Sequence, residues 1–361
     1  MKVLVTGGCG FIGNAIIRRL LREDTVVFNL DKLTYAASLE SLQDLSGSPN
    51  YSLIEGDICD QALLECLFEE LEPDAVIHCA AETHVDRSID GPSSFMETNI
   101  IGTFRLLEAA RRWWAGRKAE HRFLHVSTDE VYGSLSGNDP AFTEASAYAP
   151  NSPYAASKAS ADHLVRAWGE TYSLPVLTTN CSNNYGQWQF PEKLIPLMIV
   201  NGVERRVLPI YGEGNQVRDW LHVEDHADAI WQVLQHGKTR GTYNVGGNCE
   251  LRNVDVVDAI CANLDRKWPD FDHRSLIRNV ADRPGHDTRY AVDCGLLEKE
   301  LGWKPRISFE DGLKRTFDWY LGHQEWWQAI RQRRYNGDRL GQAANDPMQE
   351  PSGQAGLERI A

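Results

Sequence analysis

Long hydrophobic runs, paired cysteines and an excess of positive charge are all missing from this 361-residue sequence. No apolar stretch approaches the roughly 18 residues that a membrane-spanning helix needs, which argues against a membrane protein. The eight cysteines are scattered and no two have CxxC spacing, so we expect reduced thiols in the cytoplasm. The net charge of -14 disfavours general binding to nucleic acid. Met1 and Lys2 lead directly into Val-Leu-Val, which predicts a first strand rather than a removable leader.

The first half of the chain alternates between two hydrophobic patterns. Short apolar runs that suit strands buried on both faces occupy residues 2–7, 25–31, 51–58, 74–81, 122–128 and 174–182. Apolar side chains at helical spacing occupy residues 11–23, 61–72, 93–114 and 152–172. Strands that alternate with helices predict an α/β fold, here a Rossmann-type, doubly wound parallel sheet with helices on both faces.

After about residue 182 this alternation breaks down. We expect a helix at 192–204 with Pro196 near its start, strands at 206–214 and 241–247, and a strand followed by a helix across 217–237. These pieces predict a second, smaller mixed α/β lobe that binds the substrate. The predicted cofactor domain comprises 1–182 and about 217–246, and the substrate lobe about 183–216 and 247–340. Residues 341–361, rich in Gly, Pro, Gln and Ala, are predicted to be a disordered tail.

A glycine-rich turn joins the first strand to the first helix. In VTGGCGFIG, Gly7 permits the tight turn, Gly10 lets backbone N–H groups approach a pyrophosphate, and Gly13 lets the helix pack on the sheet. The N-terminus of the helix would then face the phosphates of a dinucleotide. Asp31 ends the second strand, where a carboxylate would bind the adenosine ribose hydroxyls and repel a 2′-phosphate. The pattern therefore predicts NAD rather than NADP.

Further residues are expected along the same cofactor path. Asp57 and Ile58 end the next strand, beside the adenine, and Ala80 and Ala81 follow another, where small side chains let the dinucleotide pass. The predicted cofactor-binding residues are Gly7, Gly10, Phe11, Ile12, Gly13, Asp31, Lys32, Thr34, Asp57, Ile58, Ala80, Ala81, Thr83, Tyr154 and Lys158.

Tyr154 and Lys158 lie four residues apart on a predicted helix, so their side chains share one face. A nearby ammonium favours the tyrosinate form, so we expect Lys158 to lower the pKa of Tyr154 toward the working pH. The same lysine can hydrogen-bond the nicotinamide ribose. Thr128, at the end of a strand, can polarise the hydroxyl that Tyr154 deprotonates. This combination predicts oxidation of an alcohol.

Two carboxylates, Asp129 and Glu130, follow that strand directly in the stretch HVSTDEVYGS. Adjacent like charges in a cleft push one pKa upward, so such a pair can supply both an acid and a base. Successive strand residues point to opposite faces, so both carboxyls can reach one cleft only if the strand ends by Thr128.

Together these motifs resemble the extended short-chain dehydrogenase/reductases, and within them the nucleotide-sugar 4,6-dehydratase family that acts on dTDP-glucose. Similar stretches run from Met1 to about Gly341, among them LVTGGCGFIG, STDEVYG, SPYAASKASADHLVRAW, FPEKLIPLMI and DRPGHDTRYAVD. The glycine motif and the Tyr–Lys pair mark only the superfamily. STDEVYG together with FPEKLIP is far more specific.

The resemblance implies NAD-dependent dehydration of dTDP-glucose to dTDP-4-keto-6-deoxyglucose, with tightly bound NAD that is recycled in each turnover. Tyr154 would remove the proton of the 4-hydroxyl, Glu130 would take the C5 proton, and neutral Asp129 would protonate the leaving 6-hydroxyl. Thr128 and Lys158 complete the predicted catalytic set. The resemblance also implies a homodimer, in which the helices at 93–114 and 152–172 could pair with symmetry mates.

The way the nucleotide sugar is held is likewise implied by the resemblance. Arg218, Arg283 and His286 are expected at the diphosphate, and Pro209 and Tyr211 at the base. The predicted substrate-binding residues are Thr83, Thr128, Asn184, Glu192, Lys193, Leu194, Pro209, Tyr211, Arg218, Asn253, Arg283, His286 and Tyr290.

Two departures from the family pattern stand out. Thr83 takes the place of the usual serine and keeps its hydroxyl. The segment Gln187-Trp188-Gln189 borders the expected sugar site and leaves the preferred sugar and base open.

Three alternatives are retained at this stage. A sugar-nucleotide 4-epimerase or a uronate decarboxylase would need the Tyr–Lys pair but would have no use for Asp129 and Glu130. A non-catalytic NAD-binding regulator would be expected to lack Tyr154 or Lys158, and neither is missing. No metal is predicted, because the histidines do not have the spacing of a metal site; these are His78, His84, His222 and His226.

Overall fold

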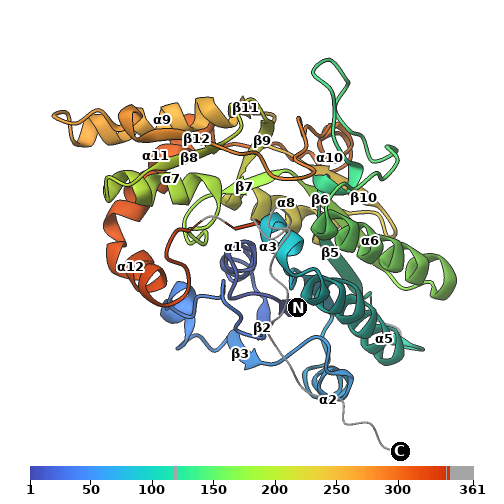
Figure 1. Cartoon of the computed structure of the whole chain (residues 1–361). Coiled ribbons are helices and arrows are strands. Elements are labelled where there is room, and N and C mark those ends of the chain that lie inside the picture. The colour runs from blue at the N-terminus through green and yellow to red at the C-terminus, as the bar shows by residue number, and fades with distance from the viewer. Residues whose placement is uncertain (118–119, 339, 342–361) are drawn as a thin grey trace, which may run out of the picture.

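A seven-stranded parallel sheet forms the centre of the computed structural model, which describes residues 1–117, 120–338 and 340–341 (Figure 1). Its strands, in the spatial order β10-β6-β5-β4-β1-β2-β3, are β1 (Lys2–Thr6), β2 (Val26–Asp31), β3 (Tyr51–Glu55), β4 (Ala75–His78), β5 (Arg122–Thr128), β6 (Val176–Cys181) and β10 (Thr242–Val245). The predicted doubly wound parallel sheet is therefore confirmed. The predicted disordered tail lies, from residue 342 onward, outside the described residues.

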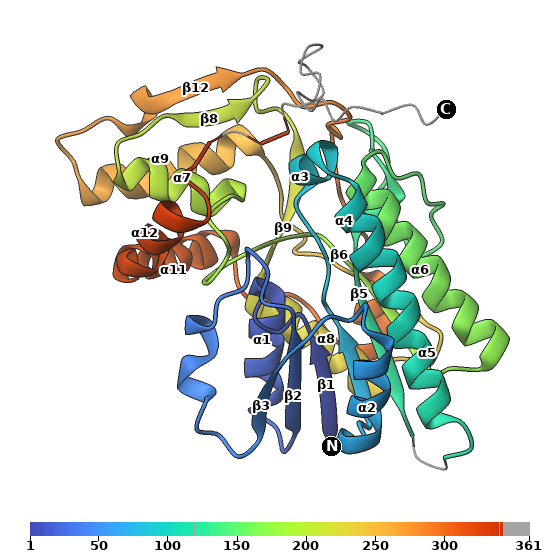
Figure 2. The same ribbon diagram turned by 60° about the horizontal axis from the view of Figure 1, so that its bottom comes forward.

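Helices cover both faces of this sheet because alternate strand side chains are apolar on both sides. In β1, Val3 and Val5 join the core beneath α1 (Phe11–Leu20) and α8 (Val223–His236). Leu4 points to the opposite core, which α2 (Gln61–Leu71), α5 (Thr103–Trp114) and α6 (Pro153–Tyr172) cover. Figure 2 shows the strands between these two helical layers.

The long helix predicted at 93–114 is divided in the structure. It begins as α4 (Ser93–Phe95), widens into a π-helical segment η2 (Met96–Gly102) and continues as α5. Within the widened segment, the side-chain amide of Asn99 accepts a hydrogen bond from the Glu82 backbone N–H at 2.9 Å and donates one to the Glu82 carbonyl oxygen at 3.0 Å. This contact ties the segment to the chain just before α3 (Val85–Asp90) and so to the sheet edge that carries the site.

A second group of elements packs against the carboxyl ends of the strands. A three-stranded sheet contains β7 (Asn183–Tyr185), β9 (Val217–His222) and β11 (Glu250–Arg252), and a two-stranded sheet contains β8 (Leu208–Tyr211) and β12 (Ile277–Val280). The neighbouring helices are α7 (Leu194–Val203), α9 (Asn253–Lys267), α11 (Phe309–Gly322) and α12 (Gln324–Arg333). The shorter elements are η1 (Glu40–Leu45), η3 (Asp129–Tyr132), η4 (His273–Leu276) and α10 (Gly295–Leu301).

These elements share an apolar core of their own, which includes Met198, Ile260, Phe317 and Trp327. Strand β9 pairs with β7 and β11 rather than with the seven-stranded sheet, whereas α8 and β10, which follow it, pack on or join that sheet. None of the helices in the described ranges combines the length and apolarity that a bilayer crossing requires.

Candidate active site

Two adjoining cavities open at the carboxyl ends of the central strands, where ligands bind in open α/β sheets. The glycine-turn cavity, of about 280 Å³, runs from the turn after β1 to Lys158, and the arginine cavity, of about 210 Å³, extends from it toward Arg218 and Arg283. The two share the wall residues Thr83, Glu130, Asn183, Glu192 and Lys193. Every predicted cofactor-binding residue lines the glycine-turn cavity.

The glycine turn leaves room for a ligand where side chains would otherwise stand. Gly7 has φ +73°, and a Cβ there would lie 2.7 Å from the Ala80 backbone. A Cβ at Gly13 would lie 2.3 Å from the Gly7 carbonyl oxygen, so the helix can approach the turn only with glycine. Around Gly10 the nearest atom to such a Cβ is the Gly7 oxygen at 3.2 Å, and α1 begins at the next residue. The turn therefore suits a pyrophosphate at the helix N-terminus.

The far end of this cavity is negatively charged. Asp31 accepts hydrogen bonds from the backbone N–H groups of Cys9 and Leu33, both at 2.8 Å. Burial raises the pKa of Asp31, and these two bonds oppose the rise. The nearby cation Lys32 is engaged with Asp57 at 2.6 Å. Such an end fits ribose hydroxyls better than a 2′-phosphate.

The strand that carries STDEVYG stops where the sequence argument requires. β5 ends at Thr128, whose Oγ1 accepts a hydrogen bond from the Glu130 backbone N–H at 3.3 Å and caps η3. The turn closes at Gly133, where φ is +91° and a Cβ would lie 2.4 Å from the Ala149 carbonyl oxygen. Asp129 and Glu130 both line the glycine-turn cavity. The prediction that the chain leaves strand geometry at Thr128 is confirmed.

The two neighbouring carboxyls have unequal surroundings. Burial raises the pKa of Asp129 well above its ordinary value, and the negative charges of Glu130 and Asp219 add to the rise. Its buried Oδ2 has no hydrogen-bond partner within the described residues. Burial also raises the pKa of Glu130, but Arg283 and Lys193 are the leading groups that oppose the rise. The arrangement suits a protonated Asp129 beside an ionisable Glu130.

Tyr154 enters the same cavity from the first turn of α6. Ser152 caps this helix, its Oγ accepting a hydrogen bond from the Ala155 backbone N–H at 3.1 Å. Burial raises the pKa of the Tyr154 hydroxyl well above its ordinary value, the Glu130 charge adds to the rise, and a hydrogen bond with Thr128 opposes it. The prediction that Lys158 lowers the pKa of Tyr154 is therefore wrong for this chain. Lys158 donates to the Val126 carbonyl oxygen at 2.8 Å, and burial is the largest influence on the pKa of Tyr154.

Cations and rings line the arginine cavity in fixed positions. The Arg218 guanidinium stacks 4.3 Å from the centre of the Tyr290 ring and donates to the Asp287 carbonyl oxygen at 2.9 Å. Arg283 donates to Asp86 at 3.0 Å. The predicted substrate-binding residues that line this cavity are Thr83, Glu192, Lys193, Leu194, Pro209, Tyr211, Arg218, Asn253, Arg283, His286 and Tyr290. Thr128 and Asn184 line the glycine-turn cavity instead.

Some wall residues escaped the sequence prediction. Asp86 orients two predicted residues at once, since it accepts hydrogen bonds from Arg283 and, at 2.8 Å, from the Tyr211 hydroxyl. Asp86 lies within AAETHVDRSIDGP, a further stretch that resembles the family, and this was the available signal. Cys181 lines the glycine-turn cavity and Tyr335 the arginine cavity, and neither belongs to a motif with a chemical pattern.

The predicted substrate residue Glu192 has its carboxylate occupied by protein groups. One oxygen accepts a hydrogen bond from Arg87 and the other from the Tyr35 hydroxyl, each at 2.9 Å. The side chain is almost fully buried. Glu192 therefore lies in the wall between the cavities with its strongest acceptor sites already used.

The side chains of the unusual segment at 187–189 line two different cavities. The Trp188 ring packs 4.7 Å from Trp319 and 5.4 Å from Trp326, and Gln187 and Trp188 line a third cavity beside α1 and α11. Gln189 lines the glycine-turn cavity and donates to the Asn184 carbonyl oxygen at 2.9 Å. The departure from the family pattern therefore borders the predicted site through Gln189 alone.

The sequence is similar to curated proteins along nearly its whole length. The family model described as GDP-mannose 4,6 dehydratase matches residues 4–316. The dTDP-glucose 4,6-dehydratase of Salmonella typhimurium is 55% identical over 350 residues, which cover 93% of this chain and 97% of that protein. The Neisseria meningitidis enzyme of the same name is 54% identical over 351 residues, covering 94% and 99%.

Solved structures give the same similarity in three dimensions. A Streptomyces venezuelae dTDP-glucose 4,6-dehydratase with NAD bound has a TM-score of 0.85 and 45% identity, covering 91% of this chain and 100% of that chain. The Bacillus anthracis enzyme in complex with NAD has a TM-score of 0.83 and 43% identity, covering 91% and 99%. A Thermus thermophilus UDP-glucose 4-epimerase is less similar in sequence, at 28% identity with a TM-score of 0.79, covering 90% and 100%.

Proposed function

Because this chain belongs to the dTDP-glucose 4,6-dehydratase family, we propose that it removes water from dTDP-glucose to give dTDP-4-keto-6-deoxyglucose, with NAD in the glycine-turn cavity. The observation that carries this proposal is the shared cavity of Asp129, Glu130 and Tyr154. An alcohol oxidation needs only the tyrosine, whereas an elimination needs an acid and a base beside it.

The oxidation step uses the residues that end β5 and begin α6. NAD, held by the residues of the glycine-turn cavity, would supply reversible hydride transfer between C4 and C6 of the sugar. Tyr154 accepts the proton of the 4-hydroxyl in its tyrosinate form, which is the minor form at neutral pH because burial raises its pKa. Thr128, hydrogen-bonded to Tyr154, holds the same oxygen. Lys158, held by the Val126 carbonyl, would donate to the ribose of bound NAD and stabilise negative charge on Tyr154.

The elimination uses the unequal carboxyls. The new 4-ketone acidifies the C5 hydrogen, which Glu130 removes as a base. Asp129, protonated because of its burial, donates its proton to the leaving 6-hydroxyl, and water departs. C5 is then reprotonated. The cations of Arg283 and Lys193 support this division, because they favour the ionised form of Glu130.

The nucleotide diphosphate is held in the arginine cavity. Arg218 and Arg283 supply local positive charge in a protein whose net charge is -14, and His286 lies beside them in the wall. Pro209 and Tyr211 offer a flat surface for the base, while Asn253, Leu194 and Tyr290 complete the wall. Glu192 supports this binding indirectly, since its carboxylate is engaged with Arg87 and Tyr35.

The alternatives fit this site less well. A 4-epimerase or a decarboxylase would not require Asp129 and Glu130 in one cavity with Tyr154. A non-catalytic NAD-binding protein would not require Tyr154 and Lys158 in that cavity.

The test uses dTDP-glucose labelled with deuterium at C4, incubated with the enzyme in ordinary water. We expect the label at C6 of a product that has lost water, without net accumulation of NADH. A C4-epimerised product that has lost no water would contradict the proposal. The same assay with other nucleotide sugars measures the preference for base and sugar.

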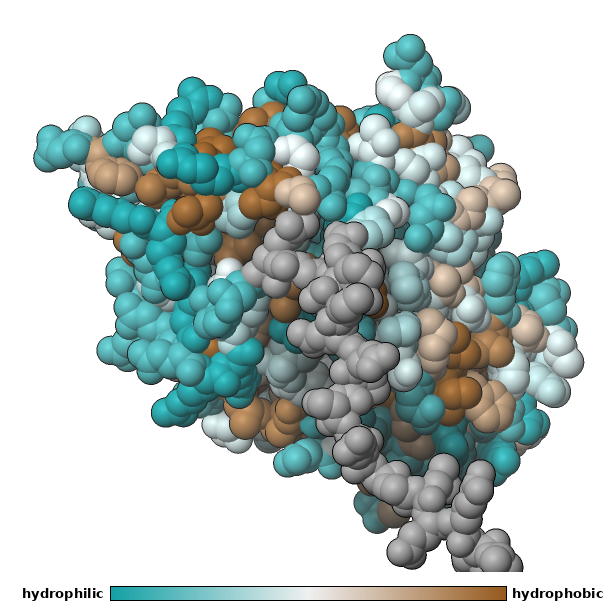
Figure 3. Space-filling model, in the orientation of Figure 1, coloured by the Kyte–Doolittle hydropathy of each residue, from teal (hydrophilic) through white to brown (hydrophobic). Residues whose placement is uncertain are grey.

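We further propose a cytoplasmic homodimer that pairs through α5 and α6. The eight cysteines are free thiols, which suits a reducing compartment. Large apolar side chains are exposed on and beside these helices at Ile101, Phe104 and Tyr172, and Figure 3 shows hydrophobic residues at the surface on this side of the molecule. Light scattering of wild type is expected to give a dimer and of Phe104→Glu a monomer. A wild-type monomer at assay concentrations would contradict this assembly.

A further inference from the structure

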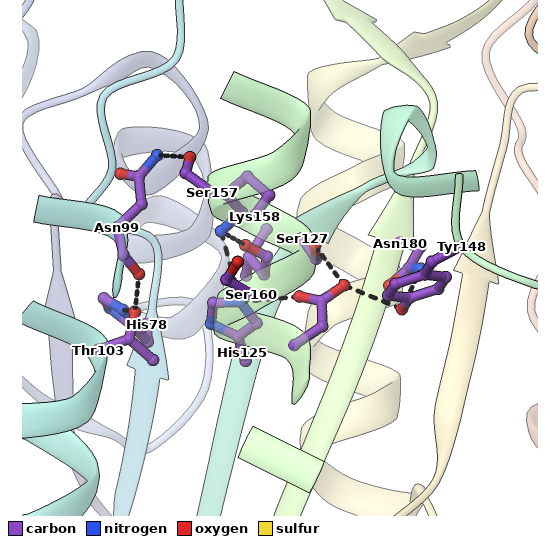
Figure 4. Close-up of polar contacts among 12 residues, drawn as sticks. His78, Asn99, Thr103, His125, Ser127, Tyr148, Ser157, Lys158, Ser160 and Asn180 are labelled. Atoms are coloured by element: carbon purple, nitrogen blue, oxygen red, sulfur yellow. Dashed lines mark hydrogen bonds and ion pairs between the residues drawn. The ribbon is translucent and has the colours of Figure 1, made fainter. Parts of the chain in front are cut away.

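Lys158 is buried in a small polar network behind the catalytic tyrosine. Its Nζ donates to the Val126 carbonyl oxygen at 2.8 Å and lies 3.4 Å from Nε2 of His125. Figure 4 shows the Lys158 and His125 side chains next to each other. The side chain is 4% exposed. Burial lowers the pKa of Lys158, because an ammonium without water is disfavoured. A cation in this position needs a nearby negative charge.

Asp162 stands one helical turn beyond Lys158 on the same helix and is 5% exposed. Its Oδ2 accepts hydrogen bonds from the Ser127 and Tyr148 hydroxyls, both at 2.9 Å. Its Oδ1 lies 3.1 Å from His125 Nε2, the same ring nitrogen that approaches Lys158. The carboxylate is thus fixed from β5 and from the chain before α6.

Other titratable groups around Lys158 carry little charge. They are His78, Cys79, His125, Tyr154 and Cys181. Burial lowers the pKa of both histidines well below its ordinary value and raises the pKa of Cys79 to about 12. It also raises the pKa of Cys181 and Tyr154. All five are neutral near pH 7, so the charge of Asp162 is the main influence that favours the charged form of Lys158.

We propose that Asp162 is a positioning residue for the oxidation step: its carboxylate keeps the ammonium of Lys158 protonated and aimed past Val126 toward the cofactor ribose. This inference rests on the proposed function. Burial raises the pKa of Asp162 to about 6, so the carboxylate is charged at neutral and alkaline pH, where Lys158 would otherwise lose its proton. Removing the charge leaves a buried ammonium with no anion beside it.

The experiment isolates hydride transfer from elimination. In a Glu130→Gln parent with NAD bound, the first turnover of dTDP-glucose is followed by NADH absorbance between pH 6 and 10. Adding Asp162→Asn is expected to move the alkaline fall of this rate to lower pH by about 1–3 units. Adding Tyr148→Phe, which removes one hydrogen bond and no charge, is expected to leave the alkaline fall in place. Asp162→Glu keeps the negative charge and should return the alkaline fall of the rate to the pH at which it occurs in the parent.

The outcomes separate the two hypotheses. If the Glu130→Gln parent itself forms no NADH, the proposed function fails. If the parent reacts and Asp162→Asn lowers the rate equally at every pH, Asp162 is only structural and the inference is overturned. Should Asp162→Asn not fold, Asp162→Ser removes the same charge with a smaller side chain and is judged by the same criterion.

A second measurement does not depend on activity. With Asp162→Asn, the folded state is expected to release the Lys158 proton at lower pH, whereas in the unfolded chain the lysine keeps its ordinary pKa of about 10.4. Stability then rises with pH in this variant. The difference in free energy of unfolding between Asp162→Glu and Asp162→Asn should narrow from pH 7 to pH 9.5. A constant difference would overturn the inference.

Discussion

The hydroxyl of Tyr35 donates a hydrogen bond to Glu192 at 2.9 Å and so joins the loop after β2 to the loop before α7. Arg87 strengthens this junction, since it donates to the other Glu192 oxygen and its guanidinium lies 3.9 Å from the centre of the Tyr35 ring. This loop begins directly after Asp31, the predicted ribose ligand, which ends β2. The junction therefore links the chain that follows the predicted ribose ligand to Glu192, which lines both cavities.

Tyr35→Phe should make NAD easier to lose. The ring keeps its edge contact with Phe190, but a hydrogen bond to a buried carboxylate, of about 1.5–3 kcal/mol, disappears. We expect NAD to dissociate roughly 10-fold faster, measured by the cofactor retained after repeated gel filtration.

Tyr51→Phe is the matched control. This tyrosine lies on β3, and its hydroxyl accepts a hydrogen bond from Asn29 within the same lobe. The Tyr51→Phe variant should retain as much NAD as wild type does. Equal retention in Tyr35→Phe would show that the junction does not hold NAD in place.

Glu130→Gln should separate oxidation from elimination. The amide keeps the size of the side chain but cannot take the C5 proton, so we expect NADH to accumulate while dehydration slows by about 10² to 10⁴. Absorbance and product analysis measure the two steps independently. Full-rate dehydration by this variant would exclude Glu130 as the base.

Asp129→Asn should make the fold more stable while it impairs the enzyme. The pKa of Asp129 is raised in the folded state, so this carboxyl holds a proton that the unfolded chain releases above its ordinary pKa of about 3.9. Its contribution to stability is therefore lost progressively as the pH rises above 4. Asparagine has no such dependence. Urea unfolding should give the variant a higher free energy of unfolding than wild type at pH 7.5, and a much smaller advantage at pH 4.5. The same advantage at both pH values would contradict the raised pKa of Asp129.

Much of the fold follows from local sequence patterns. Parallel strands buried on both faces require continuous apolar runs, and Val3, Leu4 and Val5 supply one by facing opposite cores. The end of β5 was predictable from the direction of successive side chains, because two adjacent carboxylates cannot both reach one cleft from a continuing strand.

Side-chain partners across the chain were not predictable in this way. The partners of Glu192 lie 105 and 157 residues away, so no local pattern indicates that its carboxylate is occupied. The pKa of Tyr154 was predicted in the wrong direction, because helical spacing places Lys158 on the same face but does not report how deeply the hydroxyl is buried. The pairing of β9 with β7 and β11 likewise depends on contacts that form only in the folded chain.

Trp188 should matter for stability and not for the choice of substrate. Its ring packs on Trp319 and Trp326, outside both predicted binding cavities, so Trp188→Ala should cost about 1–3 kcal/mol of stability. Its backbone has φ +67°, a left-handed conformation that disfavours residues with a Cβ. Trp188→Gly removes the same ring but relieves this strain, so it should be the more stable of the two variants. The ratio of kcat/KM values for dTDP-glucose and UDP-glucose should equal that of wild type in both. A changed ratio would mean that the departure at 187–189 sets specificity, and that Trp188 reaches the substrate through Gln189.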